Sequence, residues 1–353
     1  MVLELAKGLL ANGCEVEVVT SYWGNGEFGR RSRAAGFPTH IMRLGFISAT
    51  LTFESLRMTA HQMIFWPGLL AKYYRFLKSV GPKKIIHTNW HHALLLSPFL
   101  NRERDIYWVH EVLPDKPQYR NVFQLLARRV RCFVAVSNAV NESLCRLGID
   151  QRMIKVIHNG IEDPVSDPAR LASTGKDSVV GIVGQIGAWK GHEDLLNAFQ
   201  VVLRTKPTAQ LHVFGKAAPE YDAFLHARAT DLGIQSNIKW RGFIANQAEI
   251  YSDLTVLAVP SRSPDPLPTS AIEASFFEIP VVASRIGGLP EIIADGETGL
   301  LFESGNIDQL GRQLTLLITD PDLRNQMGRK ARERAISLFK RDRFVREFSD
   351  VLS

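Results

Sequence analysis

The second half of the chain alternates short apolar runs with helical stretches, and this alternation limits its fold more than any other feature. Strands joined in this way by helices favour a parallel sheet covered on both faces, which is an α/β architecture. The predicted strands are Val179–Val183, Gln210–Phe214, Ile238–Trp240, Leu254–Pro260 and Pro280–Ser284, and the predicted helices are Glu193–Leu203, Asp222–Leu232, Gln247–Tyr251 and Ser270–Phe277.

The first half shows the same alternation less regularly. The chain has 353 residues, more than one hydrophobic core usually covers, so we expect two doubly wound domains with a ligand cleft at the carboxyl ends of their strands. The predicted strands here are Cys14–Thr20, Lys83–Asn89, Ile106–His110 and Cys132–Ser137, and the predicted helices are Val2–Leu10, Val122–Arg129 and Asn138–Leu147.

Proline and glycine mark the expected domain boundary. Gly160, Pro164, Pro168 and Gly175 fall in one short stretch, which is typical of a linker. We therefore predict an N-terminal domain over residues 1–160, a linker over 161–178 and a C-terminal domain over 179–335. Residues 336–353 are expected to form a helix that packs back on the N-terminal domain.

Composition and charge narrow the class of protein. Hydrophobic residues make up 45% and charged residues 22%, as in ordinary globular proteins. The net charge of +6 permits anionic partners, although a merely solvated basic surface is the favoured explanation, and we expect no nucleic-acid partner. Three cysteines without metal-ligand spacing favour a reducing cytoplasm. No apolar run reaches the length of a membrane span.

The first motif that indicates chemistry is the turn Gly184–Gly191, between a predicted strand and a helix. Glycines let the backbone approach a phosphate, the helix N-terminus offers unpaired amides, and Lys190 supplies a full charge. The spacing is not that of a P-loop, because glycine follows Lys190. An ordinary strand–helix turn with an exposed lysine remains the alternative.

The second motif is Asp265–Glu273, which follows an apolar strand. Its two carboxylates are eight residues apart, one in a loop and one inside the next helix, and can converge on the hydroxyl groups of a sugar. The alternative is local: Ser270 and Glu273 have the spacing of a capping box, in which Glu273 would serve only its own helix.

The third motif is Ile286–Glu291, with Gly287 and Gly288 before a proline at a helix start. Such a turn can form an amide-lined anion pocket, and a plain loop is the alternative. Three anion-competent turns in one domain, all at the same sheet edge, are harder to explain by chance than any one of them.

Taken in order, these motifs resemble the retaining glycosyltransferases called group 1 or family 4, whose GT-B architecture sets two doubly wound, Rossmann-like domains across a cleft. The resemblance runs from Val2 to the C-terminus. The stretches that carry it are Val136–Ser137, Val156–Ile161, Lys190–Leu196, Trp240–Phe243, Pro260–Ser261, Asp265–Glu273, Pro280–Ser284, Gly287–Glu291 and Asp295–Leu301.

The resemblance implies a nucleotide-sugar donor in the C-terminal domain and a glycan or lipid-linked acceptor in the N-terminal domain. It implies that Lys190 neutralises the donor diphosphate, Glu273 holds the ribose and Asp265 contacts the transferred sugar. It implies no metal and no cofactor, the nucleotide-sugar being a co-substrate. The further donor-binding residues implied are Gly184, Gln185, Phe243, Leu267, Pro268, Thr269, Ser270, Gly287 and Gly288.

In the N-terminal half the resemblance implies a catalytic role for His110, which would border the sugar and the acceptor. The alternative is a strand-end histidine that contacts only backbone groups. His87, Trp90 and His91 cluster after the preceding strand, where relatives bind acceptors, and form a weaker candidate group.

The sequence departs from the family at several positions. Gln185 replaces the usual arginine of the phosphate turn, Asp265 the usual glutamate, and Pro268 a glycine whose amide is thereby lost. The family also begins with a strand and a glycine-rich loop that would precede Val2. We therefore expect a first, central strand of the N-terminal domain to be missing.

Aromatic and basic residues are mixed in the segment 65–78. Such a segment can lie in the interface of an anionic membrane, where lipid-linked acceptors lie, but a core-facing helix with extended lysines is the favoured interpretation. A cytoplasmic enzyme is the expectation, and a peripheral position at the inner membrane face is an alternative that this segment permits. The competing functions are a sugar-nucleotide-binding protein without turnover and a sugar-nucleotide epimerase.

Overall fold

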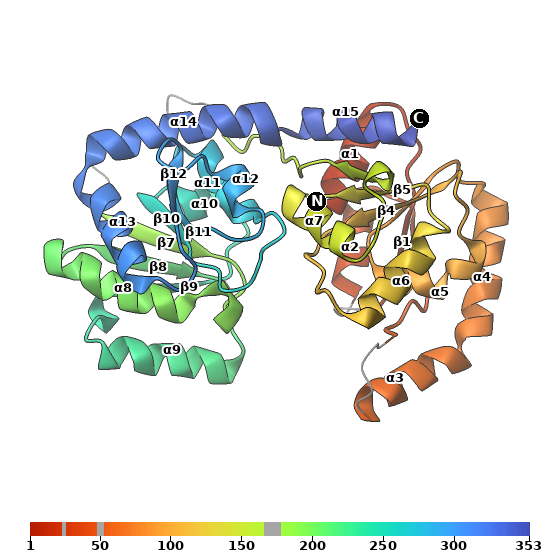
Figure 1. Ribbon diagram of the computed structural model, residues 1–353, viewed down its shortest axis with the longest axis horizontal. Coiled ribbons are helices and arrows are strands. Elements are labelled where there is room, and N and C mark those ends of the chain that lie inside the picture. The colour runs from red at the N-terminus through yellow and green to blue at the C-terminus, as the bar shows by residue number, and fades with distance from the viewer. Residues whose placement is uncertain (23–25, 48–52, 166–177) are drawn as a thin grey trace. The chain divides into compact units, whose positions relative to one another are not determined.

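The computed structural model describes residues 1–22, 26–47, 53–165 and 178–353, and the side chains of 54–56 are also left undescribed. The chain divides into two compact units (Figure 1). Unit 1 comprises Met1–Gly160 and Arg341–Ser353, and unit 2 comprises Ile161–Lys340. Most of the predicted linker, including Pro168 and Gly175, lies outside the described residues.

Unit 2 is built on one parallel sheet, six-stranded over its described residues, with the strand order β12-β11-β10-β7-β8-β9. This order is that of a doubly wound fold, in which β7 and β10 are central neighbours and the winding direction reverses between them. The strands are β7 (Val179–Val183), β8 (Gln210–Phe214), β9 (Ile238–Gly242), β10 (Val256–Val259), β11 (Val281–Ser284) and β12 (Gly299–Phe302).

Helices cover both faces of this sheet. The helix α8 packs against α9 and α13, while α11 packs against α12 and α14. Apolar side chains of α8, α13 and the strands form one buried core that includes Phe199, Leu314 and Val256. The helices of unit 2 are η5 (Ala188–Lys190), α8 (His192–Thr205), α9 (Pro219–Asp231), η6 (Gln235–Asn237), α10 (Gln247–Tyr251), α11 (Thr269–Phe276), α12 (Leu289–Ile292), α13 (Ile307–Thr319) and α14 (Pro321–Phe339).

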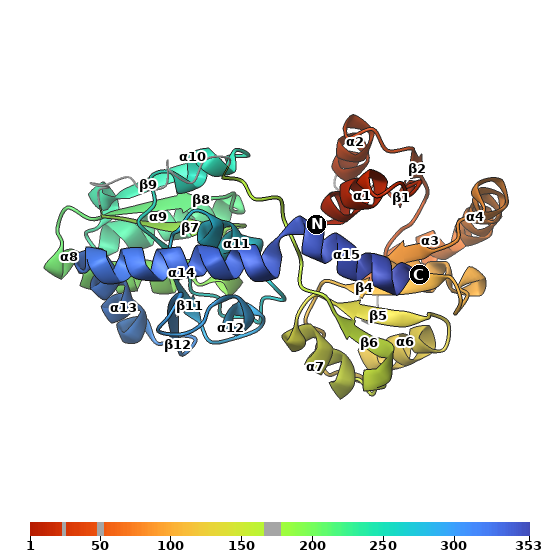
Figure 2. The same ribbon diagram turned by 90° about the horizontal axis from the view of Figure 1, so that it is seen from above.

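The strands of unit 1 form two separate parallel sheets in the part of the chain that is described. One pairs β1 with β2, and the other has the order β3-β4-β5-β6 (Figure 2). Only Val18–Thr20 of the predicted strand Cys14–Thr20 pairs with a neighbour. The strands are β1 (Val18–Thr20), β2 (Thr39–Ile41), β3 (Ile85–His87), β4 (Asp105–Val109), β5 (Cys132–Ala135) and β6 (Ile154–Val156).

The helices of unit 1 flank these sheets, with α2 against β1 and β2, α5 against β3, and α7 against β5 and β6. They are α1 (Val2–Ala11), α2 (Glu27–Ala34), α3 (Phe53–Ile64), α4 (Trp66–Val80), α5 (Trp90–Leu95), η2 (Ser97–Phe99), α6 (Pro117–Ala127), α7 (Asn138–Arg146), η3 (Gln151–Met153) and α15 (Arg341–Leu352).

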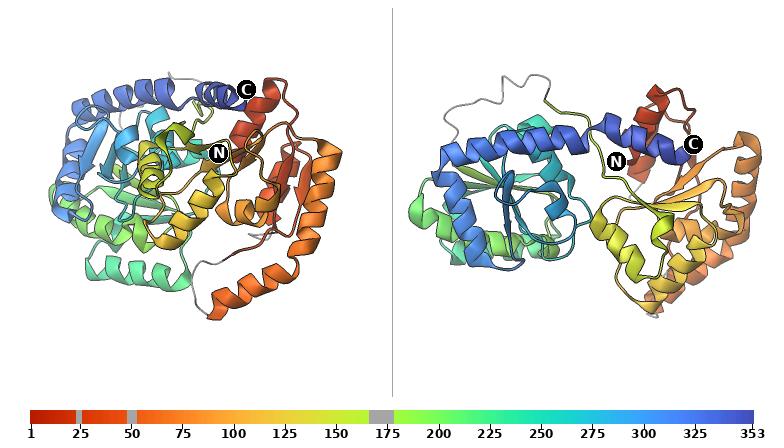
Figure 3. Two further views of the ribbon diagram at one scale, coloured as in Figure 1. Left: turned by 45° about the vertical axis from the view of Figure 1, so that its right-hand side comes forward. Right: turned by 45° about the horizontal axis from the view of Figure 1, so that its top comes forward.

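The C-terminal helix α15 belongs to unit 1 and lies against α1 (Figure 3). The two helices approach so closely that a Cβ added at Gly8 would overlap Val345. Phe344 and Phe348 of α15 are fully buried, with ring centroids 5.6 and 4.9 Å from that of Trp108 in β4. Aromatic packing therefore holds the last helix to the core of unit 1.

The predicted boundary at residue 335 differs from the observed one. The helix α14 continues to Phe339, and the units change at Lys340, which is extended and pairs with Ile161 in an isolated bridge. This extended residue ends α14 and separates it from α15, so the segment 336–353 is not one helix.

Truncation of Phe348 should destabilise unit 1, because the cavity left beside Trp108 cannot be refilled. We expect Phe348→Ala to lower the free energy of unfolding by about 3–5 kcal/mol. Urea denaturation followed by circular dichroism would measure it. Leu10→Ala is the matched control, since Leu10 lies on α1 with half its surface exposed. Equal effects of the two substitutions would contradict the assignment of α15 to the core of unit 1.

Candidate functional site

A narrow recess lies in unit 2 where the winding of the sheet reverses. Ligands of doubly wound sheets bind at this point, beyond the carboxyl ends of the strands. The recess is formed by the ends of β7 and β10 and by the starts of α8 and α11. The residues that line it are Ile182, Val183, Gly184, Gln185, Lys190, His192, Ala258, Val259, Pro260 and Ser270.

The turn that carries Lys190 is fixed against the end of β10. Gly191 has a φ of +74°, and a Cβ added there would overlap the carbonyl oxygen of Pro260, so the sharp approach requires glycine. The carbonyl of Trp189 accepts hydrogen bonds from the amides of Arg262 at 2.8 Å and Ser263 at 3.3 Å. These contacts hold the lysine turn at the recess.

The ammonium of Lys190 forms an ion pair with the carboxylate of Asp265. The two side chains are 24% and 14% exposed, so both are screened from water but accessible. The structure thus brings together the lysine of the first sequence motif and the first carboxylate of the second, which are 75 residues apart.

The third glycine motif packs against the second. Added Cβ atoms at Gly287 and Gly288 would overlap the backbone of Asp265 and Pro266 respectively. The Gly288 amide donates a 2.8 Å hydrogen bond to the carbonyl of Asp265. This amide is therefore used within the protein, and the glycines serve to fix the Asp265 loop at least as much as to form an anion pocket.

The helix α11 begins at Thr269 with Pro268 as its N-cap, and no side chain caps it. Ser270 is therefore inside the helix, and the capping box between Ser270 and Glu273 does not form. The amides of Thr269 and Ser270 have no acceptor in the part of the chain that is described. They add the positive end of a helix beside Lys190.

Glu273 is contacted by a residue of a neighbouring helix. The Tyr251 hydroxyl on α10 donates a 2.9 Å hydrogen bond to Oε2 of Glu273. Burial raises the pKa of Glu273 above its ordinary value, and hydrogen bonds from Tyr251, Gln247 and Thr269 offset part of this rise. The sequence motifs did not reveal Tyr251, because a tyrosine in a short helix has no distinctive pattern.

His192 is a second residue that the motifs did not single out, although it lines the recess. Its side chain is buried, and its Nδ1 lies 3.3 Å from the carbonyl oxygen of Gly187. Burial is the main cause that lowers the pKa of His192 to about 4. The imidazole is therefore neutral at pH 7.

The remaining predicted donor-site residues fall into three settings. Gln185 is exposed at the mouth of the recess. Leu267 and Pro268 are buried, so their side chains belong to the core. Phe243 is 69% exposed, with the Lys216 Nζ atom 5.7 Å from its ring centroid, and is not among the residues of the recess.

In unit 1, His110 follows β4 at the carboxyl edge of the four-stranded sheet. Its ring centroid lies 4.1 Å from that of Trp108, and burial lowers the pKa of His110 to about 4. Its buried Nε2 has no hydrogen-bond partner among the described residues. This nitrogen therefore does not fit the alternative of a histidine that contacts only backbone groups.

Trp90 and His91 open helix α5, and their rings lie 3.5 Å apart between centroids. The Nδ1 atom of His91 hydrogen-bonds to the carbonyl of Ile47 at 2.7 Å, and burial lowers the pKa of His91. Trp90 is buried. Of this pair, His91 keeps the more accessible ring.

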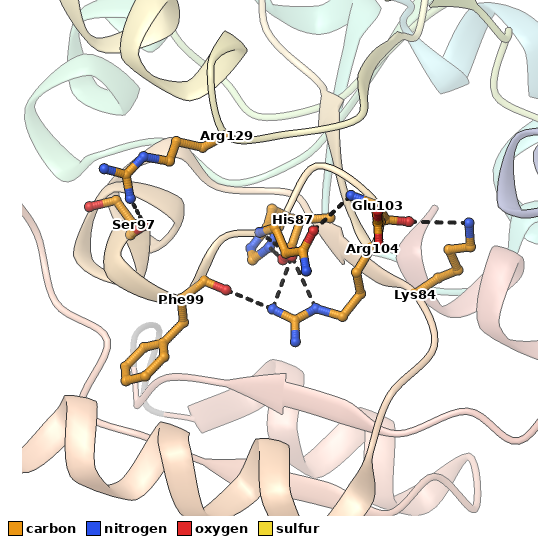
Figure 4. Close-up of polar contacts among 9 residues, drawn as sticks. Lys84, His87, Ser97, Phe99, Glu103, Arg104 and Arg129 are labelled. Carbon is orange, nitrogen blue, oxygen red and sulfur yellow. Dashed lines mark hydrogen bonds and ion pairs between the residues drawn. The ribbon is translucent and has the colours of Figure 1, made fainter.

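His87 does not join them. Its side chain is buried, and its Nε2 lies 2.6 Å from Oδ1 of Asp105, at the opposite end of β4 from His110. The Arg104 guanidinium donates to the other Asp105 oxygen at 3.0 Å and to the carbonyl of Phe99 at 2.7 Å (Figure 4). The side chain of His87 therefore points into this internal network, which does not agree with the prediction that it faces an acceptor.

An open groove of about 730 Å³ lies beside this network, between α4 and the turn before β4. Tyr74, Lys78, Phe99 and Arg102 are among its lining residues. It lies at the amino ends of the strands, where doubly wound sheets do not hold their ligands. The smaller recess in unit 2 is therefore the better candidate site.

Comparison with known proteins agrees with these features. The family described as "Glycosyl transferases group 1" matches residues 166–334, and "Glycosyltransferase Family 4" matches residues 1–163. The structure is similar to HepE of Anabaena in complex with UDP and glucose, with a TM-score of 0.80, 19% identity and coverage of 99% of this chain and 94% of that one. The expected α/β fold with two Rossmann-like domains is confirmed.

Curated relatives match over shorter stretches. The D-inositol 3-phosphate glycosyltransferase of Segniliparus rotundus is 32% identical over 51% of this chain and 42% of its own length. The N-acetyl-alpha-D-glucosaminyl L-malate synthase of Bacillus anthracis is 24% identical over 68% of this chain and 64% of its own length. The chain thus spans less than two thirds of these relatives.

The depressed pKa of His192 makes stability depend on pH. The unfolded state takes up the proton near the ordinary value of 6.5, while the folded state resists it down to about 4, so stability is lost as pH falls through that window. Between pH 7.5 and 4.5, we expect the free energy of unfolding of His192→Gln to fall by about 2–4 kcal/mol less than that of the wild type. Urea denaturation at pH 7.5 and 4.5 would measure it.

His226→Gln is the matched control, because the His226 side chain is 49% exposed on α9 of the same unit. Identical pH dependence in the wild type and both variants would show that His192 takes up its proton normally in the folded state.

Proposed function

We propose that this chain, which belongs to the group 1 and family 4 glycosyltransferases, moves a sugar from a nucleotide-sugar donor to a glycan or lipid-linked acceptor. The proposal is supported most directly by one observation. Lys190, Asp265 and the first amides of α11 meet at the reversal point of the sheet in unit 2. A diphosphate and a sugar are the ligand groups that this combination of charges fits.

The chemistry asks for stabilisation of a leaving group. As the bond between the sugar C1 atom and the diphosphate oxygen breaks, negative charge grows on the diphosphate. Lys190 and the free amides of Thr269 and Ser270 are fixed before the reaction, so they stabilise this charge without reorganisation. We propose that these groups suffice without a metal ion.

We further propose that the configuration at C1 is retained. The acceptor oxygen would form its bond to C1 on the face that the diphosphate leaves, and the departing diphosphate would take the acceptor proton. The neutral His110 of unit 1 would border the sugar and acceptor and offer a hydrogen bond to them. Proton NMR coupling constants of the product would show whether the anomeric configuration is kept.

Two other functions differ in what they predict. A binding protein without turnover would hold the nucleotide-sugar unchanged, and an epimerase would convert it with no acceptor. Product analysis with and without acceptor glycans distinguishes all three.

The Lys190→Ala variant should lose nucleotide binding, because among the described residues no other cation lines the recess. We expect wild-type protein to bind one of the UDP-, GDP- and ADP-sugars, and Lys190→Ala to bind it at least tenfold more weakly, as loss of a charged hydrogen bond implies. Isothermal calorimetry would measure both. Lys206→Ala, an exposed lysine at the end of α8, is the control.

The Asp265→Asn variant separates binding from transfer. Without its carboxylate partner, Lys190 is freed for the diphosphate, so nucleotide affinity should hold or rise while sugar transfer falls.

A folded wild-type protein that binds none of the donors would refute the donor site. Equal losses in Lys190→Ala and Lys206→Ala would refute the role of Lys190.

The acceptor proposal includes peripheral contact with an anionic membrane. No helix in the described part of the chain is long and apolar enough to span a bilayer. The helices α3 and α4, which are labelled in Figure 1, instead carry exposed large apolar side chains. Among them are Phe53 at 84%, Ile64 at 72% and Tyr74 at 50% exposure. Exposed Arg75 and exposed Lys78 lie on the same pair of helices. Apolar groups beside cations suit the interface of an anionic bilayer.

Removal of the two most exposed apolar groups should weaken membrane contact. We expect Phe53→Ser with Ile64→Ser to reduce binding to vesicles of phosphatidylglycerol and phosphatidylcholine about tenfold or more, because each side chain loses apolar area that the bilayer would bury. Vesicle co-sedimentation would measure it. Leu316→Ser, at a 44% exposed position of α13, is the control. Absence of wild-type binding would refute the contact.

A further inference from the structure

The contact between Tyr251 and Glu273 joins two helices that are distant in sequence. Tyr251 ends α10 and is fully buried, with its ring stacked on Phe277 at a centroid distance of 5.2 Å. Its hydroxyl lies 2.9 Å from Oε2 of Glu273 and 3.2 Å from the carbonyl oxygen of Ser270. The phenol is thus held at both its ring and its hydroxyl.

We propose that Tyr251 is a positioning residue of the donor site, whose hydroxyl orients the Glu273 carboxylate for a ligand hydroxyl group and keeps it ionised. The inference rests on the proposed donor site. It adds a residue to which no sequence motif points, and it gives α10 a role in the site.

The need for such a residue follows from the burial of Glu273. An ionised carboxylate accepts hydrogen bonds at about four positions and is costly to bury with those positions empty. The Tyr251 hydroxyl donates to the carboxylate at 2.9 Å, and Gln247 and Thr269 also favour its charged form. Acceptor positions then remain for hydroxyl groups of the ligand.

The same Tyr251 hydroxyl also contacts the first turn of α11. Because it lies within reach of the Ser270 carbonyl as well as Glu273, it relates the carboxylate to the helix start whose amides lie beside Lys190. A ligand that spans both would find its hydroxyl-binding and phosphate-binding groups in a fixed relation. Burial raises the pKa of Tyr251 well above its ordinary value, so the phenol remains a donor at working pH.

The test is Tyr251→Phe, which removes the hydroxyl and keeps the ring. Without this hydrogen bond the Glu273 carboxylate should protonate at higher pH. Two measurements follow it: carbon-13 NMR titration of labelled glutamate carboxyls, with Glu273→Gln to assign the signal, and calorimetric binding of UDP, GDP and ADP from pH 5.5 to 8. The wild-type chain and Tyr221→Phe, a tyrosine of α9 in the same unit, are the comparisons.

We expect the Glu273 signal of Tyr251→Phe to titrate at higher pH than in wild type. Nucleotide affinity should be about tenfold lower at the pH where Glu273 of the variant is protonated and should recover above that pH. Tyr221→Phe should match wild type in both. An unchanged Glu273 titration, or an affinity loss equal at every pH, would overturn the positioning role. If wild type binds no nucleotide, the proposed donor site fails, while the NMR titration still decides whether Tyr251 acts on Glu273.

Discussion

Close contact between backbone segments at the carboxyl edge of the unit 2 sheet sets the geometry of the whole site. The lysine turn touches the end of β10 at Gly191, and the turn after β11 touches the Asp265 loop at Gly287 and Gly288. Each contact leaves no room for a Cβ atom, so the loops after β7, β10 and β11 form one packed layer. Lys190 and Asp265 meet because their backbones are fixed in this layer, before any ligand contributes.

Burial then decides which polar groups can work at this edge. Glu273 and His192 both lose water contact, with opposite results. The carboxylate receives donors from Tyr251, Gln247 and Thr269 that favour its charged form, whereas burial leaves His192 neutral. The described part of the site thus combines the carboxylates of Glu273 and Asp265, an uncharged ring and the cation Lys190. Under the proposed function, this set would bind both hydroxyl and phosphate groups of a ligand without a group that must change its charge.

The sequence predicted most of unit 2, because its strands and helices carry strong local patterns. The observed β8 and α10 have the predicted bounds, and β10 and α11 differ only at their ends. Contacts between distant residues were not predictable in the same way. The alternative of a capping box between Ser270 and Glu273 was wrong, because Pro268 is the N-cap of α11 and Ser270 lies inside the helix. The contact of His87 with Asp105 was not predictable, because nothing near His87 in the sequence indicates a partner 18 residues later. The break at Lys340 likewise depends on its pairing with Ile161.

The ion pair of Lys190 and Asp265 also bears on the energy of ligand binding. A lone half-buried lysine would lose hydration without compensation, so its pairing with Asp265 keeps the site stable before ligand arrives. Under the proposed function, a diphosphate, which carries more charge than one carboxylate, would replace Asp265 as the partner of Lys190. Asp265 would then be released beside the ligand, where a sugar hydroxyl could donate to it. Because one ion pair replaces another, the binding energy depends on the difference between the two partners, and a ligand without a phosphate gains little from Lys190.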